Sequence, residues 1–207
     1  MLASRESAKL TRSERQLSLT PLLLKVDAMN KKEIKAQVHA LIEAGTPKSE
    51  VFSQLSGQGI KDSQLAYFVA AYPNPQRREQ HKRKVNLLVM AMLLYALMAF
   101  LVGFAIGSQI GPTGRWVLAV VIATIPLLFA WGFHNYKVAA YNVYILLSLI
   151  NLPRAFDGFM AHPLANSIAL AINIGMIAFV WYVRYKLFPD FLFITPVKVK
   201  GEYHFQP

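Results

Sequence analysis

Long apolar runs separated by short polar segments occupy the second half of the chain. The first run, residues 85–108, contains 24 residues and is apolar almost throughout. At 1.5 Å per residue a helix of this length crosses a hydrocarbon core of about 30 Å. Only helices fit such runs, because backbone groups in hydrocarbon must be satisfied internally. The pattern predicts four spans at about 85–108, 116–133, 136–152 and 164–183. The third is the shortest and the most polar of them.

The front of the chain follows a different pattern. Ile34, Val38, Leu41 and Ile42 repeat at the spacing of one helix face. Gly45 ends that helix, and two further short helices are expected before the prolines of "YPNPQ" break the pattern. Three helices of this size bury little apolar surface by themselves. We therefore expect this part to pack on the membrane spans, on a second copy or on a partner.

These patterns predict an all-α fold, a polytopic membrane protein with four transmembrane helices and a small N-terminal three-helix module. The expected parts are a disordered or non-native extension (1–29), a cytoplasmic helical module (30–76), a four-span transmembrane domain (77–187) and a cytoplasmic or interfacial tail (188–207). The sequence from Met29 onward is typical of a bacterial start. The tail alternates apolar and polar residues, and an interfacial segment is favoured over a short strand.

Charge then orients the predicted spans. Of the 22 Lys and Arg residues, 15 fall in residues 1–84, and basic residues gather on the cytoplasmic side of membrane helices. An even number of spans places both termini in the cytoplasm, and three spans would not. The topology-setting residues are Arg77, Arg78, Lys82, Arg83, Lys84, Arg184 and Lys186.

A net charge of +11 raises the question of nucleic acid. The charge, however, gathers beside an apolar run, where anionic lipid and topology explain it. A three-helix module admits a helix-turn-helix interpretation, but the candidate recognition helix, Asp62–Tyr72, contains no Lys or Arg. A helix that reads DNA needs side chains that reach bases and phosphates. The sequence argues against nucleic acid as a partner.

Reactive chemistry is sparse in the predicted spans. The chain has no cysteine, and no Asp or Glu occurs from residue 80 to residue 156. Proton-coupled transporters place carboxylates inside the bilayer, and metal enzymes need clustered ligands. The five histidines are scattered, and Asp157 with His162 supplies two ligands at most. We expect no enzyme activity, no metal and no cofactor.

Two polar or small-residue patterns stand out within the spans. Ala99, Gly103, Gly107 and Gly111 are four residues apart, a spacing that lets helix backbones approach closely. Packing against another span of the same chain is favoured over self-association. The three intramembrane asparagines are Asn142, Asn166 and Asn173. They are interpreted as hydrogen-bonding contacts between helices, with a polar lining for a small pore as the alternative.

The opening "MNKKEIKAQVHALIEAG", the four apolar runs and the closing "YKLFPDFLF…GEYHF" resemble small bacterial inner-membrane proteins of uncharacterised function. The resemblance implies a multi-pass protein of the bacterial inner membrane and brings no catalytic or binding residues. We expect a non-enzymatic protein that acts through protein contacts, as an adaptor, immunity-type or assembly factor. Its partners would be the lipid bilayer and a protein partner or further copies of itself. The alternatives are a small oligomeric channel or transporter with an asparagine-lined path, and a membrane-tethered DNA-binding regulator.

Overall fold

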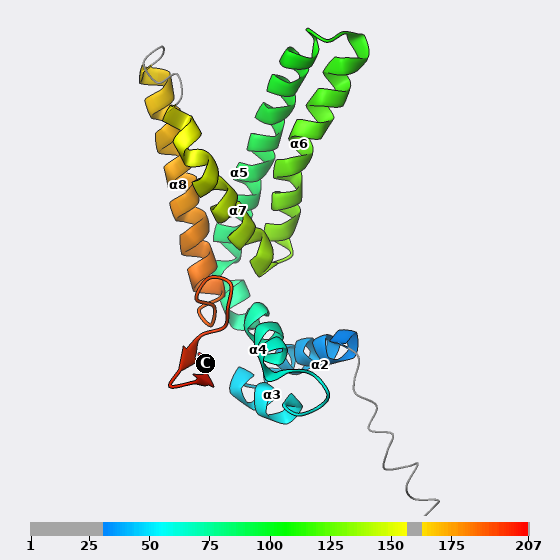
Figure 1. The fold of residues 1–207 in the computed structure, drawn as a ribbon, viewed down its shortest axis with the longest axis vertical. Coiled ribbons are helices and arrows are strands. Elements are labelled where there is room, and N and C mark those ends of the chain that lie inside the picture. Colours follow the sequence, from blue (N-terminus) through cyan, green and yellow to red (C-terminus); the bar gives the residue numbers. More distant parts are fainter. Residues whose placement is uncertain (1–30, 157–162, 207) are drawn as a thin grey trace, which may run out of the picture.

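The computed structural model describes residues 31–156 and 163–206. The predicted extension at 1–29 and the Asp157–His162 pair lie outside these residues. Within them the chain is mainly helical, which confirms the all-α class (Figure 1). The elements are α2 (Lys31–Glu43), α3 (Lys48–Leu55), α4 (Asp62–Ala71), α5 (Pro75–Gly107), α6 (Pro112–His134), α7 (Val138–Asn151), the 3-10 helix η1 (Leu152–Phe156), α8 (Pro163–Leu187), and the short strands β1 (Lys198–Val199) and β2 (Glu202–Tyr203).

Helices α2, α3 and α4 enclose a hydrophobic cluster of their own. The face of α2 predicted from spacing supplies Ile34, Val38 and Ile42, all at most 2% exposed. The other buried members come from α3 and α4: Val51, Leu55, Leu65 and Val69. Gly45, at φ +88°, occupies the left-handed region where α2 ends, which glycine adopts without steric cost. Apolar periodicity and one glycine thus account for the local structure.

Helix α5 is longer than the span predicted within it. Asn74 caps the helix, its side-chain oxygen accepting a hydrogen bond from the Gln76 backbone N–H at 3.0 Å, and Pro75 occupies the first turn, where no N–H is needed. The basic segment before Val85 is therefore helical and continuous with the apolar run. This continuity joins the front of the chain to the membrane helices without a flexible linker.

Figure 1 shows two helical arms that diverge from a common end. One arm consists of α5 and α6, and the other consists of α7, η1 and α8. The α2–α4 helices and the C-terminal segment (residues 188–206) both lie at the end where the arms meet. Among the described residues, α5, α6 and α8 are long and apolar enough to cross a membrane, which indicates a membrane protein.

The predicted third span, 136–152, is not one long helix. Tyr136 lies in a turn with φ +51°, so α7 begins only at Val138 and is 14 residues long. Pro153 disfavours α-helix in the residue before it, and the chain continues as η1 from Leu152. α7 alone is therefore too short to be counted with the three spanning helices. The sequence pattern had merged a turn, a helix and a 3-10 segment.

The C-terminal segment is folded against the rest of the protein rather than lying as a simple interfacial tail. Strands β1 and β2 pair antiparallel, with Gly201 at φ +90° in the turn. The Phe205 side chain packs against both the α2–α4 cluster and the larger cluster of the membrane helices. Phe52 on α3 contacts the rings of Tyr203 and Phe205, with centroids 5.4 and 5.6 Å away. Aromatic packing at both ends thus fixes the segment.

Two glycines of the predicted stripe bring α5 and α6 into backbone contact. A Cβ added at Gly103 would lie 2.8 Å from the Ala119 Cα, and one at Gly107 would lie 2.6 Å from the Arg115 Cα. Both distances are too short for any side chain. The stripe therefore packs on a helix of the same chain over these two positions.

The ends of the stripe have other roles. Gly111 is not a packing residue within α5, because that helix ends at Gly107 and Gly111 precedes α6 with φ +135°. No atom lies within 4 Å of a Cβ built at Gly111, so glycine is needed there for the backbone conformation of the turn and not for close packing. Ala99 is half-buried. Gly114, which the stripe did not include, faces the Ile110 side chain across the same turn.

Replacing Gly103 by alanine should destabilise the α5–α6 arm by about 1–3 kcal/mol, because the new methyl group must push the α6 backbone away. The matched control is Gly175→Ala on α8, where no atom lies within 4 Å of the added Cβ. Alanine's helix propensity should leave that variant unchanged or up to about 1 kcal/mol more stable. Thermal unfolding in mild detergent measures both. Equal stability of Gly103→Ala and the parent would contradict the close contact.

Candidate functional site: a polar junction where the helical arms meet

A buried ion pair joins the front of the chain to its C-terminal segment. The Lys48 Nζ at the start of α3 lies 2.6 Å from the Asp190 Oδ2, which follows α8. The two residues are 142 positions apart, and their side chains are only 6% and 1% exposed. A buried charge without a partner is strongly unfavourable. Each of these two segments therefore requires the other in order to pack.

Asp190 also holds its own segment in shape. Its Oδ1 accepts a hydrogen bond from the Gln206 backbone N–H at 2.7 Å, and its carbonyl oxygen accepts one from the Val197 N–H at 2.8 Å. One aspartate thus binds α3 and both sides of the loop that carries β1 and β2. The negative charge is shared among a lysine ammonium and a backbone donor, as buried carboxylates require.

A buried arginine forms the second part of the junction. Arg184, 1% exposed at the end of α8, donates from Nε to the Asn142 Oδ1 at 2.5 Å. Its Nη2 donates to the carbonyl oxygens of Phe193 (3.0 Å) and Leu192 (3.3 Å). Among the described residues no carboxylate forms an ion pair with it. This arginine is solvated by neutral oxygens of α7 and of the C-terminal segment, which it fastens together.

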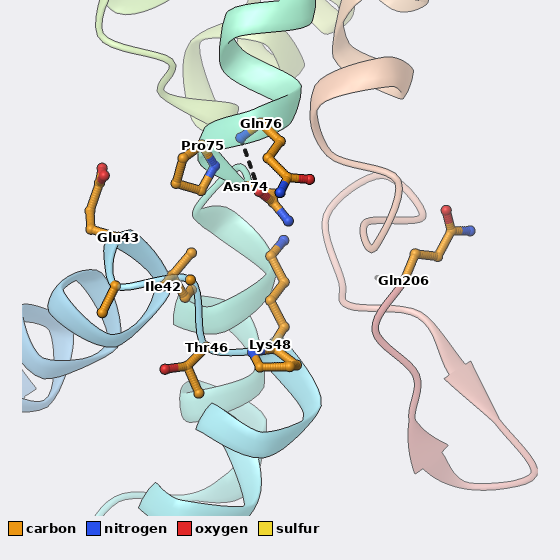
Figure 2. A pocket seen from close by; sticks show the side chains of 11 residues that line it. Ile42, Glu43, Thr46, Lys48, Asn74, Pro75, Gln76 and Gln206 are labelled. Carbon is orange, nitrogen blue, oxygen red and sulfur yellow. Dashed lines mark hydrogen bonds between the residues drawn. The ribbon is translucent and has the colours of Figure 1, made fainter.

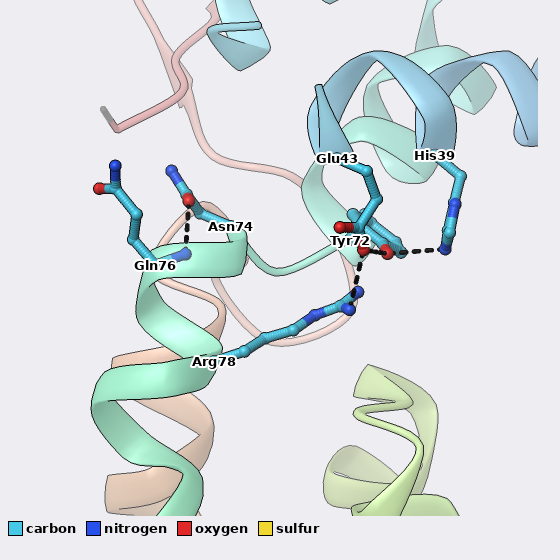
Figure 3. A network of polar contacts seen from close by, with 6 residues as sticks. All are labelled: His39, Glu43, Tyr72, Asn74, Gln76 and Arg78. Carbon is cyan, nitrogen blue, oxygen red and sulfur yellow. Dashed lines mark hydrogen bonds and ion pairs between the residues drawn. The ribbon is translucent and has the colours of Figure 1, made fainter. Parts of the chain in front are cut away.

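The third part of the junction connects α2, α4 and α5 (Figure 3). The Tyr72 hydroxyl donates to the Glu43 carboxylate and lies 2.6 Å from the His39 Nε2. Arg78 Nη1 donates to the same carboxylate at 3.1 Å, and its guanidinium lies 4.2 Å from the Tyr72 ring centroid. Arg78 also lies 5.4 Å from the ring of Tyr136 in the α6–α7 turn. These contacts fix the angle between the α2–α4 helices and α5.

The electrostatics of the junction follow from burial and partners. Burial, with the hydrogen bond to Glu43, raises the pKa of Tyr72 to about 12. The same hydrogen bond lowers the pKa of the Glu43 carboxyl below 4.5. Burial lowers the pKa of the Lys48 ammonium, and the Asp190 carboxylate opposes that shift. At neutral pH these groups therefore form charged or neutral hydrogen-bonded partners that stabilise the fold.

A pocket of about 330 Å³ opens beside this junction (Figure 2). It lies between the α2–α3 loop, the turn before α5 and the C-terminal segment. Its polar side chains are those of Glu43, Thr46, Lys48, Asn74, Gln76 and Gln206. Lys48 extends from α3 toward Asn74 in this view. Three stretches of chain, far apart in sequence, thus surround a small pocket that no local motif indicated.

The three asparagines do not meet. Asn142 is at the junction, where its amide donates to the Phe193 carbonyl oxygen at 2.6 Å and its oxygen accepts from Arg184. Asn166 lies 18 residues before Arg184 on the same helix, which places the two about 27 Å apart. Asn142 and Asn166 therefore lie at opposite ends of the α7–α8 arm. The condition for an asparagine-lined path, convergence on one cavity, is not met by this set.

The helix proposed for reading DNA is occupied by internal packing. Leu65, Ala66, Val69 and Ala70 of α4 are fully buried. On another face of α4, the Tyr67 ring lies 5.3 Å from the Phe191 ring of the C-terminal segment. The helix has no free face with basic side chains. Two faces of α4 are therefore used in internal packing.

The basic residues predicted to set the topology lie at the same end of the molecule. Arg78 and Arg184 take part in the junction. Lys82 and Arg83 on α5 and Lys186 on α8 are exposed, and Arg77 and Lys84 are partly buried. Lys82 pairs with Glu79 at 3.3 Å on the surface. Across residues 31–156 and 163–206, no three His, Asp or Glu side chains come together as a group that could hold a metal ion.

Sequence reasoning missed the partners that define the junction. The sequence indicated no role for Lys48, and Asp190 follows the last apolar run. The one available signal was the isolation of Asp190, the single carboxylate between residues 158 and 201. Pairing it with a residue 142 positions away requires the fold.

Comparison with known proteins gives no relative. No family model matches the chain, no curated protein matches it, and no solved structure matches it.

Removing one charge of the buried Lys48–Asp190 pair should lower the stability of the protein more than removing both charges. Asp190→Asn leaves the Lys48 ammonium buried beside an amide, and should lower the free energy of unfolding by about 3 kcal/mol. Lys48→Met combined with Asp190→Asn removes both charges while keeping an oxygen for the Gln206 N–H, and should recover at least half of that loss. Thermal or denaturant unfolding in detergent measures the cycle. Additive losses in the double variant would contradict coupling between the two side chains.

The protein should lose stability between about pH 10 and pH 12 in part through Tyr72. Its folded-state pKa is raised from 10 to about 12, so the folded state holds the proton more tightly than the unfolded state. The contribution is present below pH 10 and is lost as pH rises through 12. Tyr72→Phe should flatten the stability-versus-pH slope in this window. An unchanged slope in Tyr72→Phe would show that Tyr72 makes no such contribution.

Proposed function

We propose that this protein is a four-span protein of the bacterial inner membrane that acts through protein contacts, with α2–α4 and the C-terminal segment forming a cytoplasmic platform. The observation that carries the proposal is the junction described above. Lys48–Asp190, Arg184–Asn142 and the Tyr72 network hold this platform at a fixed position on the membrane helices. A surface held rigidly at the membrane is what an adaptor or assembly factor requires.

Four crossings are supported by the length of the α7–η1 segment. Fourteen α-helical residues and five 3-10 residues together extend for about 31 Å. That length matches the hydrocarbon thickness of about 30 Å. In Figure 1 this segment runs beside α8 along the second arm. An even number of crossings also agrees with the gathering of basic residues at the junction end, which would face the cytoplasm.

A non-enzymatic role is supported by how the polar side chains of the membrane helices are used. Thr124 donates to the Val120 carbonyl, Ser108 to the Ala105 carbonyl and Asn151 to the Leu147 carbonyl. Such local bonds satisfy backbone oxygens in a setting without water. Asn142 and Arg184 serve the junction. These five polar side chains are thus used in holding the fold.

Topology can be tested with reporter fusions. Fusions after residue 84, in the 134–137 turn and after residue 200 should report cytoplasm, whereas fusions at residues 112 and 158 should report the opposite side. The expected alternation follows from four crossings and from the basic residues at the junction end. A cytoplasmic signal at residue 158 would remove the α7–η1 crossing from the proposal.

The contact function can be tested by site-specific photocrosslinking in cells at native expression. A photoreactive residue at Gln37 or Gln54, which line a hollow of about 300 Å³ between α2 and α3, should give one discrete protein adduct. A residue at Leu97, exposed on α5 toward lipid, serves as the control. Adducts from the platform should persist in Gly175→Ala and disappear in Asp190→Asn, which loosens the platform. An adduct-free pattern at all platform positions would contradict the proposal.

A further inference from the structure

Two lysines from different helices meet at one tyrosine near the junction end of the membrane helices. Lys84 Nζ on α5 donates to the Tyr182 hydroxyl of α8 at 2.7 Å and lies 4.7 Å from its ring centroid. Lys186 Nζ, one turn further along α8, lies 6.0 Å from the same ring. Two ammonium groups thus face one side chain.

His81 adds to this site from the preceding turn of α5. The positive charges that act on its ring are those of Lys84, Lys186 and Arg77. Its Nδ1 is buried and has no hydrogen-bond partner among the described residues. A buried polar atom without a partner is rare in native structures, and this nitrogen can accept a hydrogen bond from, or donate one to, a bound group.

Carboxylates do not neutralise this cluster in the described residues. Glu79 pairs with Lys82 on the exposed surface of α5, and Asp190 is taken by Lys48. The charge of Lys84 and Lys186 therefore remains available for an anion. Lys84 uses one of its three N–H donors on Tyr182 and retains two, while the Tyr182 hydroxyl can still donate its own proton.

The depth of the site fits a lipid headgroup. Lys84 is the last residue before the apolar run of α5, and Leu87, one turn deeper on the same face, is 59% exposed. On α8 the exposed aromatic rings of Trp181, Tyr182 and Tyr185 lie at the same level, as is typical of the membrane–water interface. Basic pockets between membrane helices at this level bind anionic headgroups.

We propose that Lys84, Lys186, Tyr182 and His81 form a binding site for the phosphate of an anionic phospholipid held between α5 and α8. The ammonium groups bind the phosphate oxygens, Tyr182 donates to one of them, and the His81 ring completes the site from α5. The acyl chains lie along the exposed apolar face that begins at Leu87. The bound lipid joins the two helical arms at their interface with the headgroup region. The site requires that α5 and α8 cross the membrane, and it does not depend on which side of the membrane the junction end faces.

The test compares the purified protein with added phosphatidylglycerol and phosphatidylcholine, using native mass spectrometry and thermal unfolding. The parent should retain phosphatidylglycerol preferentially and should melt at a higher temperature in its presence. Lys84→Gln with Lys186→Gln should weaken phosphatidylglycerol binding by roughly 30-fold, at about a factor of five for each lysine. Lys84→Arg with Lys186→Arg should keep the preference, because the positive charges remain.

The matched control is Lys82→Gln with Arg83→Gln, which removes the same charge near the same end of α5 from side chains outside the proposed site. Retained binding in that control supports a defined site. Equal loss in both double variants would overturn it in favour of diffuse attraction. Displacement of the lipid by millimolar inorganic phosphate would overturn the lipid assignment, since free phosphate shares the headgroup chemistry. A parent protein with no preference for phosphatidylglycerol would overturn the proposal even if the glutamine variants fail to fold.

Discussion

The need to neutralise a carboxylate that water cannot reach determines how this protein is assembled. Asp190 is 1% exposed and accepts from Lys48 on one oxygen and from the Gln206 backbone on the other. The first partner lies in α3 and the second near the end of the described chain. Since neither oxygen is left for solvent, the α2–α4 helices, α8 and the C-terminal segment must come together in one arrangement. Phe205, which packs on both hydrophobic clusters, fills the apolar space between them.

The two helical arms meet at the junction by different physical means. In the α5–α6 arm, Gly103 and Gly107 allow backbones to touch, and dispersion between closely packed surfaces replaces the hydrophobic effect that lipid cannot supply. In the α7–α8 arm, polar bonds at the junction end between Arg184, Asn142 and Phe193 hold the elements. The first arm is therefore closely packed along the glycine stripe. The second depends on a few strong contacts at the end where the platform attaches.

The sequence predicted features that are local along the chain. Periodic apolar residues located the cluster of Ile34, Val38 and Ile42, and the apolar runs located the three long helices. The glycine spacing identified Gly103 and Gly107 because a four-residue repeat is a property of one helix. It failed at Gly111, where the helix had already ended and backbone conformation, not spacing, required glycine.

The junction could not be predicted because its partners are distant in sequence. Asn142 read as a polar residue in a span, and only the fold brings it to Arg184, 42 residues away. The α7 boundary depended on Tyr136 and Pro153, whose local effects are small beside the apolar content of the run. The hydropathy of the run therefore predicted one span where the structure has a turn, α7 and η1. The C-terminal segment alternates like a strand, but its aromatic residues are buried by α3 and α4 rather than by a sheet.

The separation of Lys48 from Asp190 has a consequence for biosynthesis. Ribosomes add about 5–20 residues per second, so the 142 residues between the two take roughly 7–30 s to synthesise. The α5–α6 hairpin can close early in this interval, since its contacts are local. The platform helices, in contrast, wait beside the membrane with an unpaired lysine and an open aromatic face until the last strand emerges. The front of the chain therefore reaches its final packing only after Asp190 and the segment that follows it have been synthesised.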